Sequence, residues 1–322
     1  MQKFLRRGAE LLSPRTGSPA TTDDDENYGF KTASTQTALF PKVDPAVDGK
    51  ADWVRDVADE KGSVMEAIDK GGLTPTNGNL KLSASNIPVP DEYHHAEDGA
   101  RPTTVVLLPA FKIIDHVTPA LAPDLIKYFV NPSITTTTPL RSNPSTTTIP
   151  ANGISEQDLS SLTPLRSRPL PHAAVILLCS QKTRDARCGQ SAPLLKREFE
   201  RHLRTHGLYR DSHDERPGGV AVHFISHVGG HKYSANVIIY RRRDFDWHKK
   251  IASSSTAAAA TEEEKVQAQQ SQDEGAAQGI WLARVRPEEC ENIIKFTILQ
   301  GKLVKPDQLR GGFDREKGLV SW

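Results

Sequence analysis

The sequence predicts a mixed α/β protein with two folded parts and several segments of low complexity. Its 322 residues exceed the usual size of a single hydrophobic core. Short apolar runs typical of buried strands alternate with helical patterns along the chain. Only 37% of the residues are hydrophobic, which is low for a globular chain, so we expect part of the length to be disordered.

The composition excludes two classes of partner. The chain has 41 Lys and Arg residues against 40 Asp and Glu residues, and this net charge of +1 gives no field that would recruit nucleic acid or an anionic membrane. No apolar run approaches the roughly 18 residues needed to span a bilayer. We therefore expect neither a nucleic acid nor a membrane as a partner.

Residues 1–40 are predicted to be a disordered leader or a presequence. Their first sixteen residues contain four basic side chains and a single acid, Glu10, with leucines and a phenylalanine between them. This composition is typical of a mitochondrial presequence. We therefore expect the mitochondrion. The alternative is a cytosolic protein with a basic, disordered tail.

Residues 41–130 are predicted to form a smaller α/β domain, related to the domain that follows. The apolar residues between Trp53 and Ile68 have helical spacing, the run TTVVLLPAF at 103–111 is typical of a buried strand, and APDLIKYFV at 122–130 has a helical pattern. From 131 to 170 the chain is dominated by Thr, Ser and Pro without an apolar face. We interpret 131–170 as a linker.

Residues 171–322 are predicted to form the second domain. A helix is expected from Ser191, as its N-cap, to Gly207, and another from Pro287 to Gly301. Strands are expected at 173–179, 220–226, 236–240 and 280–285, with a low-complexity insertion rich in Ala, Glu and Gln at 251–279. Without that insertion the order is β, α, β, β, α. This is the order of a thioredoxin-like core.

Two cysteines and two histidines follow neighbouring strands of this predicted core. Cys179 ends the first strand, Cys188 follows after eight residues, and His227 and His231 follow the second strand with a Gly-Gly pair between them. Thiolates and imidazoles together suit zinc or an iron–sulfur cluster. Zinc fingers separate paired cysteines by only about two to four residues, whereas eight residues form a loop that can surround a larger cofactor.

Other polar and thiol residues have simpler interpretations. Cys290 lies on the apolar face of the last predicted helix, so we expect it to pack in the core. The arginines at 241–243 are interpreted as a solvated run of charge rather than a nucleic-acid site.

Several motifs together resemble one family. The segments CSQKTRDARCG, HGLYRD, ISHVGGHKYSANVIIY, WLARV and RGG resemble the sucrase/ferredoxin-like family of thioredoxin-like ferredoxins, most densely over 173–250 and 280–322. The resemblance implies a [2Fe–2S] cluster held by Cys179, Cys188, His227 and His231. It also implies a thioredoxin-like ferredoxin domain at the C-terminal end.

We therefore expect a redox protein that transfers electrons through this cluster, and whether it is also an enzyme is left open. A thiol–disulfide oxidoreductase using Cys179 and Cys188, or a structural zinc module that binds partners, are the alternatives. The expected partners are an unidentified redox protein and the iron–sulfur cluster assembly machinery, the latter suggested by the terminal Trp322. The basic loop residues are Lys182, Arg184 and Arg187. They either stabilise the reduced cluster, dock an acidic electron donor, or are ordinary solvated charges.

Overall fold

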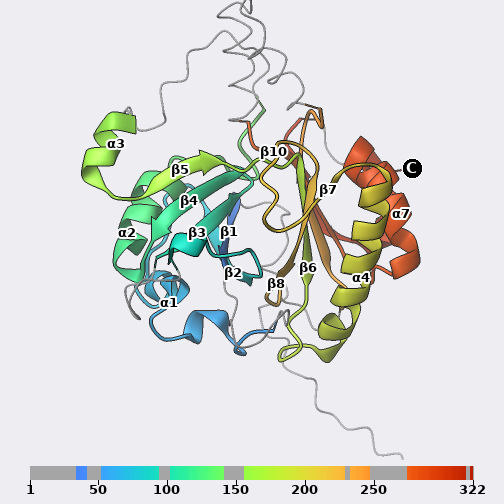
Figure 1. The fold of residues 1–322 in the computed structure, drawn as a ribbon, viewed down its shortest axis with the longest axis horizontal. Coiled ribbons are helices and arrows are strands. Elements are labelled where there is room, and N and C mark those ends of the chain that lie inside the picture. The colour runs from blue at the N-terminus through green and yellow to red at the C-terminus, as the bar shows by residue number, and fades with distance from the viewer. Residues whose placement is uncertain are drawn as a thin grey trace, which may run out of the picture.

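Two halves of the chain repeat one order of elements. A computed structural model describes residues 34–41, 52–93, 102–140, 156–228, 233–246, 274–316 and 320–321 (Figure 1). The first half consists of β1 (Thr35–Pro41), α1 (Val64–Asp69), β2 (Asn79–Ser85), β3 (Thr103–Leu108), β4 (Lys112–Val117) and a helical segment that includes α2 (Ala122–Asp124). The second consists of β6 (Ala174–Cys179), α4 (Ala186–Thr205), β8 (Val220–Ile225), β9 (Val237–Arg242), β10 (Ala276–Leu282) and a helical segment that includes α7 (Cys290–Asn292).

The strands of each half have the same neighbours. In the first half β1 pairs in parallel with β2 and antiparallel with β3, which pairs with β4. In the second half β6 pairs in parallel with β8 and antiparallel with β9, which pairs with β10. The spatial order is therefore second, first, third, fourth strand in both halves. This order agrees with the thioredoxin-like topology expected for the C-terminal part, and that finer assignment stays a prediction.

One residue pair joins the two half-sheets, and further strands extend their outer edges. β2 and β8 meet antiparallel through the pair Ser85 and Ile225, so that all these strands belong to one sheet of eleven. The outer edges are extended by β5 (Arg166–Pro169), which pairs with β4, and by β12 (Leu309–Asp314), which pairs with β10. The remaining short elements are β7 (Tyr209–Arg210), β11 (Lys302–Leu303), β13 (Val320–Ser321) and α3 (Glu156–Leu162).

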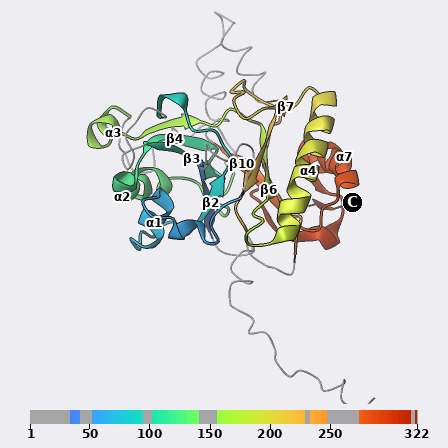
Figure 2. The ribbon, with the colours of Figure 1, turned by 60° about the horizontal axis from the view of Figure 1, so that its bottom comes forward.

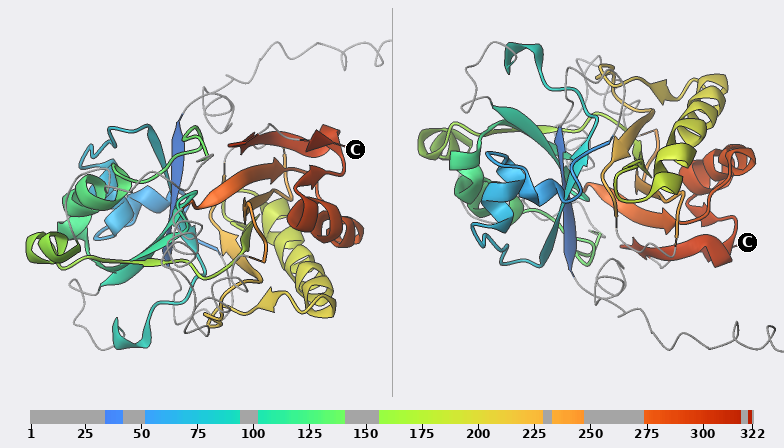
Figure 3. Two further views of the ribbon diagram at one scale, coloured as in Figure 1. Left: turned by 90° about the horizontal axis from the view of Figure 1, so that it is seen from above. Right: turned by 90° about the horizontal axis from the view of Figure 1, so that it is seen from below.

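The two half-sheets pack face to face, with helices on their outer sides. Figures 1 and 2 show α1 and α2 on one side of the molecule and α4 and α7 on the other, and Figure 3 shows the strands between them from above and below. Alternate residues of each strand face the helices or the opposite half-sheet. Leu39 and Val106 of the first half are buried in one apolar cluster with Val175 and Leu177 of the second. The two halves therefore share one hydrophobic core.

The two terminal helical segments show the repeat most clearly. Each begins with Pro in a three-residue 3-10 turn, continues through three α-helical residues and ends in six residues of π-helix. The π-helical parts have the sequences LIKYFV and IIKFTI, which share a Lys before an aromatic residue. In both, the Lys ammonium lies over that aromatic ring. This agreement supports the prediction that the two halves are related.

Three predicted boundaries differ from the structure. β1 begins at Thr35, inside the predicted leader, because TQTALFP is buried between β2 and β3. The predicted linker contains α3 and β5. The sequence RSRP of β5 lacks an apolar face because β5 is an edge strand, and among the described strands it pairs with β4 alone. β10 begins at Ala276, so the predicted insertion ends earlier than residue 279.

The arginines of β9 also differ from their interpretation as solvated charges. Arg241 donates to the carbonyl of Ile298 at 2.9 Å and to Gln278 Oε1 at 2.7 Å, and Arg242 donates to the carbonyl of Leu170 at 3.0 Å. Both side chains are buried. They satisfy carbonyl groups inside the fold, where an unpaired acceptor would cost free energy. In the described part of the chain, no helix is long and apolar enough to cross a membrane.

Candidate metal centre

Three of the four predicted ligands meet at one edge of the second half-sheet. Cys179 is the last residue of β6 and is paired in register with Ile225 at the end of β8, two residues before His227. The sulfur atoms of Cys179 and Cys188 and a ring nitrogen of His227 lie within 4.8 Å of one another. The distance from Cys179 Sγ to His227 Nδ1 is 3.8 Å. Among the described residues this is the one group of three such side chains close enough to share a metal.

The fourth predicted ligand, His231, lies outside the described residues, as do Gly229 and Gly230. Val228 and Tyr233 are the described residues on either side of that stretch. His231 therefore stays a prediction. The three described donors are two sulfurs and one imidazole nitrogen, a soft set that suits zinc or an iron–sulfur cluster and disfavours magnesium or calcium.

Cys188 lies in the first turn of α4 and not in a loop before it. The helix begins at Ala186 because Asp185, in an extended conformation, accepts a hydrogen bond from the Arg187 N–H at 3.0 Å. The prediction of Ser191 as the N-cap is wrong, because Ser191 is inside the helix. Gly189 is required in this turn, since a Cβ there would lie 2.6 Å from Lys182 Cβ. The loop of 180–185 and the helix start thus bring the second sulfur back to the first.

The protonation of the two thiols is coupled. A hydrogen bond from the Cys179 thiol, with a further one from His227, lowers the pKa of Cys188 to about 5, against the effect of burial. The same hydrogen bond to Cys188, together with burial, raises the pKa of Cys179 well above its usual value. A position in the first turn of a helix also favours a thiolate. At neutral pH the pair therefore holds one negative charge before any metal binds.

The N-terminal half holds the loop between the two cysteines. The buried amide of Gln181 donates to the carbonyl of Val54 at 2.6 Å and accepts from the His227 N–H at 2.7 Å. Asp52 accepts from the backbone N–H of Thr183 at 3.0 Å and from its hydroxyl at 2.8 Å. Gln181 thus connects one predicted ligand with the other half of the molecule.

The sequence does not predict that Gln181 and Asp52 connect the two halves. A single polar residue in a loop has no periodic signal, and only the fold brings segments 52–55 and 181–183 together. The one available indication was the position of Gln181 two residues after a cysteine that is itself a predicted ligand.

Two further cationic side chains, Lys81 and Arg310, lie close enough to interact with each other. Lys81 of β2 and His227 both border a small pocket of about 30 Å³, and burial lowers the pKa of Lys81 to about 8. Arg310 lies with its guanidinium 4.2 Å from the centre of the Trp281 ring and 4.4 Å from that of Tyr233. It also donates to Asn236 Oδ1 at 3.1 Å. Arg310 of the RGG segment thus holds Asn236, the residue before β9, by a hydrogen bond. Asn236 follows His231 by five residues in the sequence.

Cys290 packs in the core, as predicted. Its side chain is fully buried, and desolvation raises the pKa of its thiol to about 12. All three cysteines are free thiols in the structure, and Cys290 belongs to a different apolar cluster from Cys179 and Cys188.

Comparison with known proteins identifies the family. The model of the family described as sucrase/ferredoxin-like matches residues 36–311, which is most of the chain. The chain belongs to the sucrase/ferredoxin-like family. The match includes both halves of the fold and all four predicted ligands.

Curated relatives are fungal proteins. The chain is 55% identical over 69 residues to actin patches distal protein 1 of Saccharomyces cerevisiae, an alignment that covers 21% of this chain and 22% of that protein. It is 26% identical over 183 residues to altered inheritance of mitochondria protein 32 of Clavispora lusitaniae, covering 57% and 49% of the two chains. The same-named protein of Meyerozyma guilliermondii is 29% identical over 137 residues, covering 42% and 34%. The chain spans about half or less of these relatives, and no solved structure matches it.

Proposed function

We propose that this chain is an electron-transfer protein that binds a [2Fe–2S] cluster through Cys179, Cys188, His227 and His231. The observation that carries the proposal is the convergence of two sulfurs and an imidazole nitrogen within 4.8 Å at the end of two parallel strands. Membership of the sucrase/ferredoxin-like family supports it. When bound, such a cluster would supply one-electron oxidation and reduction.

The donor set determines what kind of potential is expected. Two neutral imidazoles in place of two thiolates leave less negative charge on the cluster, which favours its reduced form. The potential is therefore expected to lie well above the roughly −400 mV of a plant-type, all-cysteine ferredoxin. The positive charge of Lys81 next to His227 acts in the same direction, because it also favours an added electron.

The surface around the loop fits an acidic redox partner. Lys182 is exposed and Arg184 is partly exposed on the segment between the two cysteines. Arg187, by contrast, is paired with Asp185 at 2.8 Å. Lys182 and Arg184 are thus the cations of this loop that we assign to docking an acidic electron donor or acceptor.

A thiol–disulfide oxidoreductase is the second candidate function. It is favoured by the proximity of the two sulfurs and by the lowered pKa of Cys188 at a helix N-terminus. In such a reaction Cys179 and Cys188 would be oxidised to a disulfide while a substrate disulfide is reduced to two thiols. This function gives no role to His227 as a ligand, and both sulfurs are buried from solvent.

The midpoint potential of a His227→Cys variant tests the proposal. A thiolate in place of the imidazole adds negative charge, so the cluster should be retained and its potential should fall. His206→Cys, at an exposed position at the end of α4, is the control and should leave the potential unchanged. An unchanged potential in His227→Cys would remove this histidine from the ligand set.

We further propose that the protein acts in the mitochondrion. Two of the three relatives described above have names that refer to the inheritance of mitochondria, and the basic start of the chain fits a presequence. A fusion of residues 1–33 to a fluorescent reporter tests this. A cytosolic reporter would favour the cytosol, and with it cluster delivery that depends on the terminal Trp322, a residue outside the described part of the chain.

A further inference from the structure

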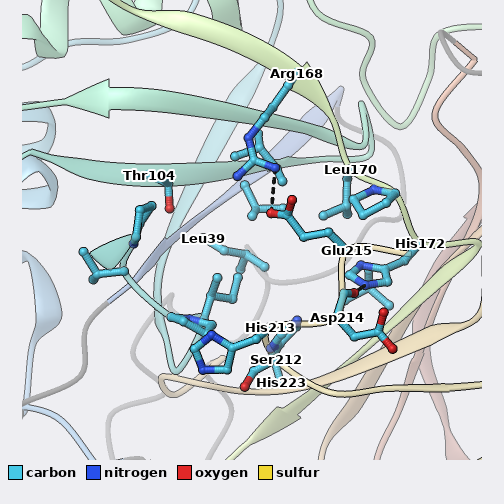
Figure 4. A pocket seen from close by; sticks show the side chains of 18 of the residues that line it. Leu39, Thr104, Arg168, Leu170, His172, Ser212, His213, Asp214, Glu215 and His223 are labelled. Carbon is cyan, nitrogen blue, oxygen red and sulfur yellow. Dashed lines mark hydrogen bonds and ion pairs between the residues drawn. The ribbon is translucent and has the colours of Figure 1, made fainter. Parts of the chain in front are cut away.

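A second cavity lies between the two half-sheets, away from the metal centre. It measures about 240 Å³ and is bordered by β1, β3, β4 and β5 of one half and by β6 and β8 of the other, with segments 87–91 and 212–215 at its rim. Figure 4 shows the side chains that surround it. His223 of β8 lines this cavity and precedes His227 by four residues, which separates the two sites by roughly 13 Å of extended chain.

Part of the cavity wall is apolar. Leu39, Val106, Ile113, Leu170 and Val175 line it, and all five are buried. The cavity exceeds the roughly 150 Å³ of an engineered apolar cavity that binds benzene. An organic molecule with one or two rings therefore matches its size.

Arg168 lines the cavity and forms a neutral pair with Asp115, while Glu215, its second partner, is mostly exposed to water. Its guanidinium donates to Asp115 Oδ2 at 2.8 Å and to Glu215 Oε1 at 2.9 Å, and Figure 4 shows the contact with Glu215. An anionic ligand would have to compete with these two carboxylates for the arginine. A cationic ligand would have to compete with the arginine for the carboxylates.

The other acidic groups of the lining provide no unpaired charge inside the cavity that would attract a cationic ligand. Asp214 is paired with Arg216 through three side-chain contacts, of 2.9, 3.1 and 2.6 Å. Asp91 is exposed, at the rim. The interior of the cavity therefore favours an uncharged molecule, since a charge moved there from water would lose its hydration without a dedicated counter-ion.

Two buried histidines supply hydrogen-bond acceptors. His172 Nε2 lies 3.2 Å from the carbonyl oxygen of Asp214, and since a carbonyl only accepts, Nε2 carries the proton and Nδ1 is left as an acceptor. Among the described groups, neither His172 Nδ1 nor His223 Nδ1 has a hydrogen-bond partner, although both atoms are buried. Burial lowers the pKa of His172 to about 4 and that of His223 to about 3, so both rings are neutral at pH 7.

We propose that this cavity binds an uncharged organic molecule of one or two rings that bears a hydroxyl or N–H group, which donates a hydrogen bond to the imidazole of His172 or His223. Buried polar atoms without partners are rare in folded proteins and cost free energy. A donor on the ligand removes that cost, while the ring fills the apolar part of the cavity. The proposal does not depend on a cluster at Cys179 and Cys188.

The test compares two probes of equal size, 2-naphthol and 2-methylnaphthalene, which differ in the donor alone. Binding is measured from probe fluorescence at pH 7 with the wild-type protein, with the double variant His172→Phe/His223→Phe and with His206→Phe as a surface control. We expect wild type and the control to bind 2-naphthol about tenfold more tightly than 2-methylnaphthalene. In the double variant the two probes should bind equally.

A second measurement keeps the test independent of how the double variant folds. In the wild-type protein labelled with ¹⁵N-histidine, 2-naphthol should shift the resonance of an unprotonated histidine nitrogen, whereas 2-methylnaphthalene should not. Binding of neither probe, equal binding of both by wild type, or a preference that persists in a folded double variant would each overturn the proposal. So would saturation with 2-naphthol that leaves every histidine nitrogen resonance in place.

Discussion

Replacing Gln181 by Met tests whether the N-terminal half holds the metal centre together. Met has about the length of Gln and fills the same buried space, but its thioether replaces none of the hydrogen bonds of the amide, of which the two shortest join it to Val54 and His227. The His227 N–H would lose its acceptor at 2.7 Å, and the carbonyl of Val54 would lose its donor at 2.6 Å. The variant therefore removes the hydrogen bonds of Gln181 between the two halves without opening a cavity, while the β2–β8 pairing and the contacts of Asp52 with Thr183 remain.

The size of the effect follows from these two bonds. A buried donor or acceptor left without its partner costs about 1–3 kcal/mol. Both groups are only partly buried, so water satisfies them in part, and we expect a total loss of about 2–4 kcal/mol in the free energy of unfolding. For a domain of 150–250 residues this corresponds to a fall in Tm of roughly 5–15 °C.

The measurement is urea unfolding of the purified protein at pH 7, compared with the control Gln190→Met. Gln190 is exposed on α4, so the same chemical change there should alter stability by less than about 0.5 kcal/mol. Reconstitution with iron and sulfide gives a second readout, in which Gln181→Met should retain less cluster than the control. A Gln181→Met protein as stable as Gln190→Met, with the same cluster content, would refute a supporting role for the N-terminal half.

Three further predictions follow from other contacts. Burial lowers the pKa of His223 to about 3 in the folded protein. As the pH falls below 6.5, His223 is therefore protonated in the unfolded chain but not in the folded protein, and this favours unfolding. Wild type should therefore lose about 2 kcal/mol more than His223→Phe between pH 6.5 and 4.5 in urea unfolding, and equal losses would contradict the assignment. In metal-free protein, absorbance near 240 nm should show a thiolate forming with a pKa of about 5 that disappears in Cys188→Ser and persists in Cys290→Ala; a first step above pH 8 would be inconsistent with the thiol pair. Arg310→Lys, which loses the planar stacking on Trp281, should lower the free energy of unfolding by about 1–2 kcal/mol and shift tryptophan fluorescence, and an unchanged spectrum would exclude the stacking.

The sequence predicts the second half of the fold well because its strands are buried on both faces. β6 and β8 are continuous apolar runs, as strands covered on both sides must be, and they stand out without any alignment. The placement of Cys179 and His227 follows from the same pattern, since the ends of parallel neighbouring strands lie at one edge of a sheet. The family prediction is confirmed, whereas the cluster itself stays a proposal.

The features that the sequence did not predict depend on contacts between distant segments. β5 is polar because it is an edge strand, and β1 has only three strongly apolar side chains, Ala38, Leu39 and Phe40, so neither has a strong local signal. The start of α4 was misplaced because Asp185 and Ser191 are both acceptable N-caps in the sequence, and only the tertiary structure selects the first. Gln181 and Arg242 donate hydrogen bonds to backbone carbonyls that are distant in the sequence. Neither a lone amide nor a run of arginines in the sequence indicates such partners.

Metal and sulfide analysis combined with electron paramagnetic resonance of anaerobically purified protein tests the central claim most directly. The proposed site predicts about two iron and two sulfide ions per chain and a resonance signal after reduction, both lost in Cys179→Ser and retained in Cys290→Ala. A colourless protein with stoichiometric zinc would contradict the claim. A metal-free protein with a reducible disulfide between Cys179 and Cys188 would contradict it as well and would favour the thiol–disulfide oxidoreductase.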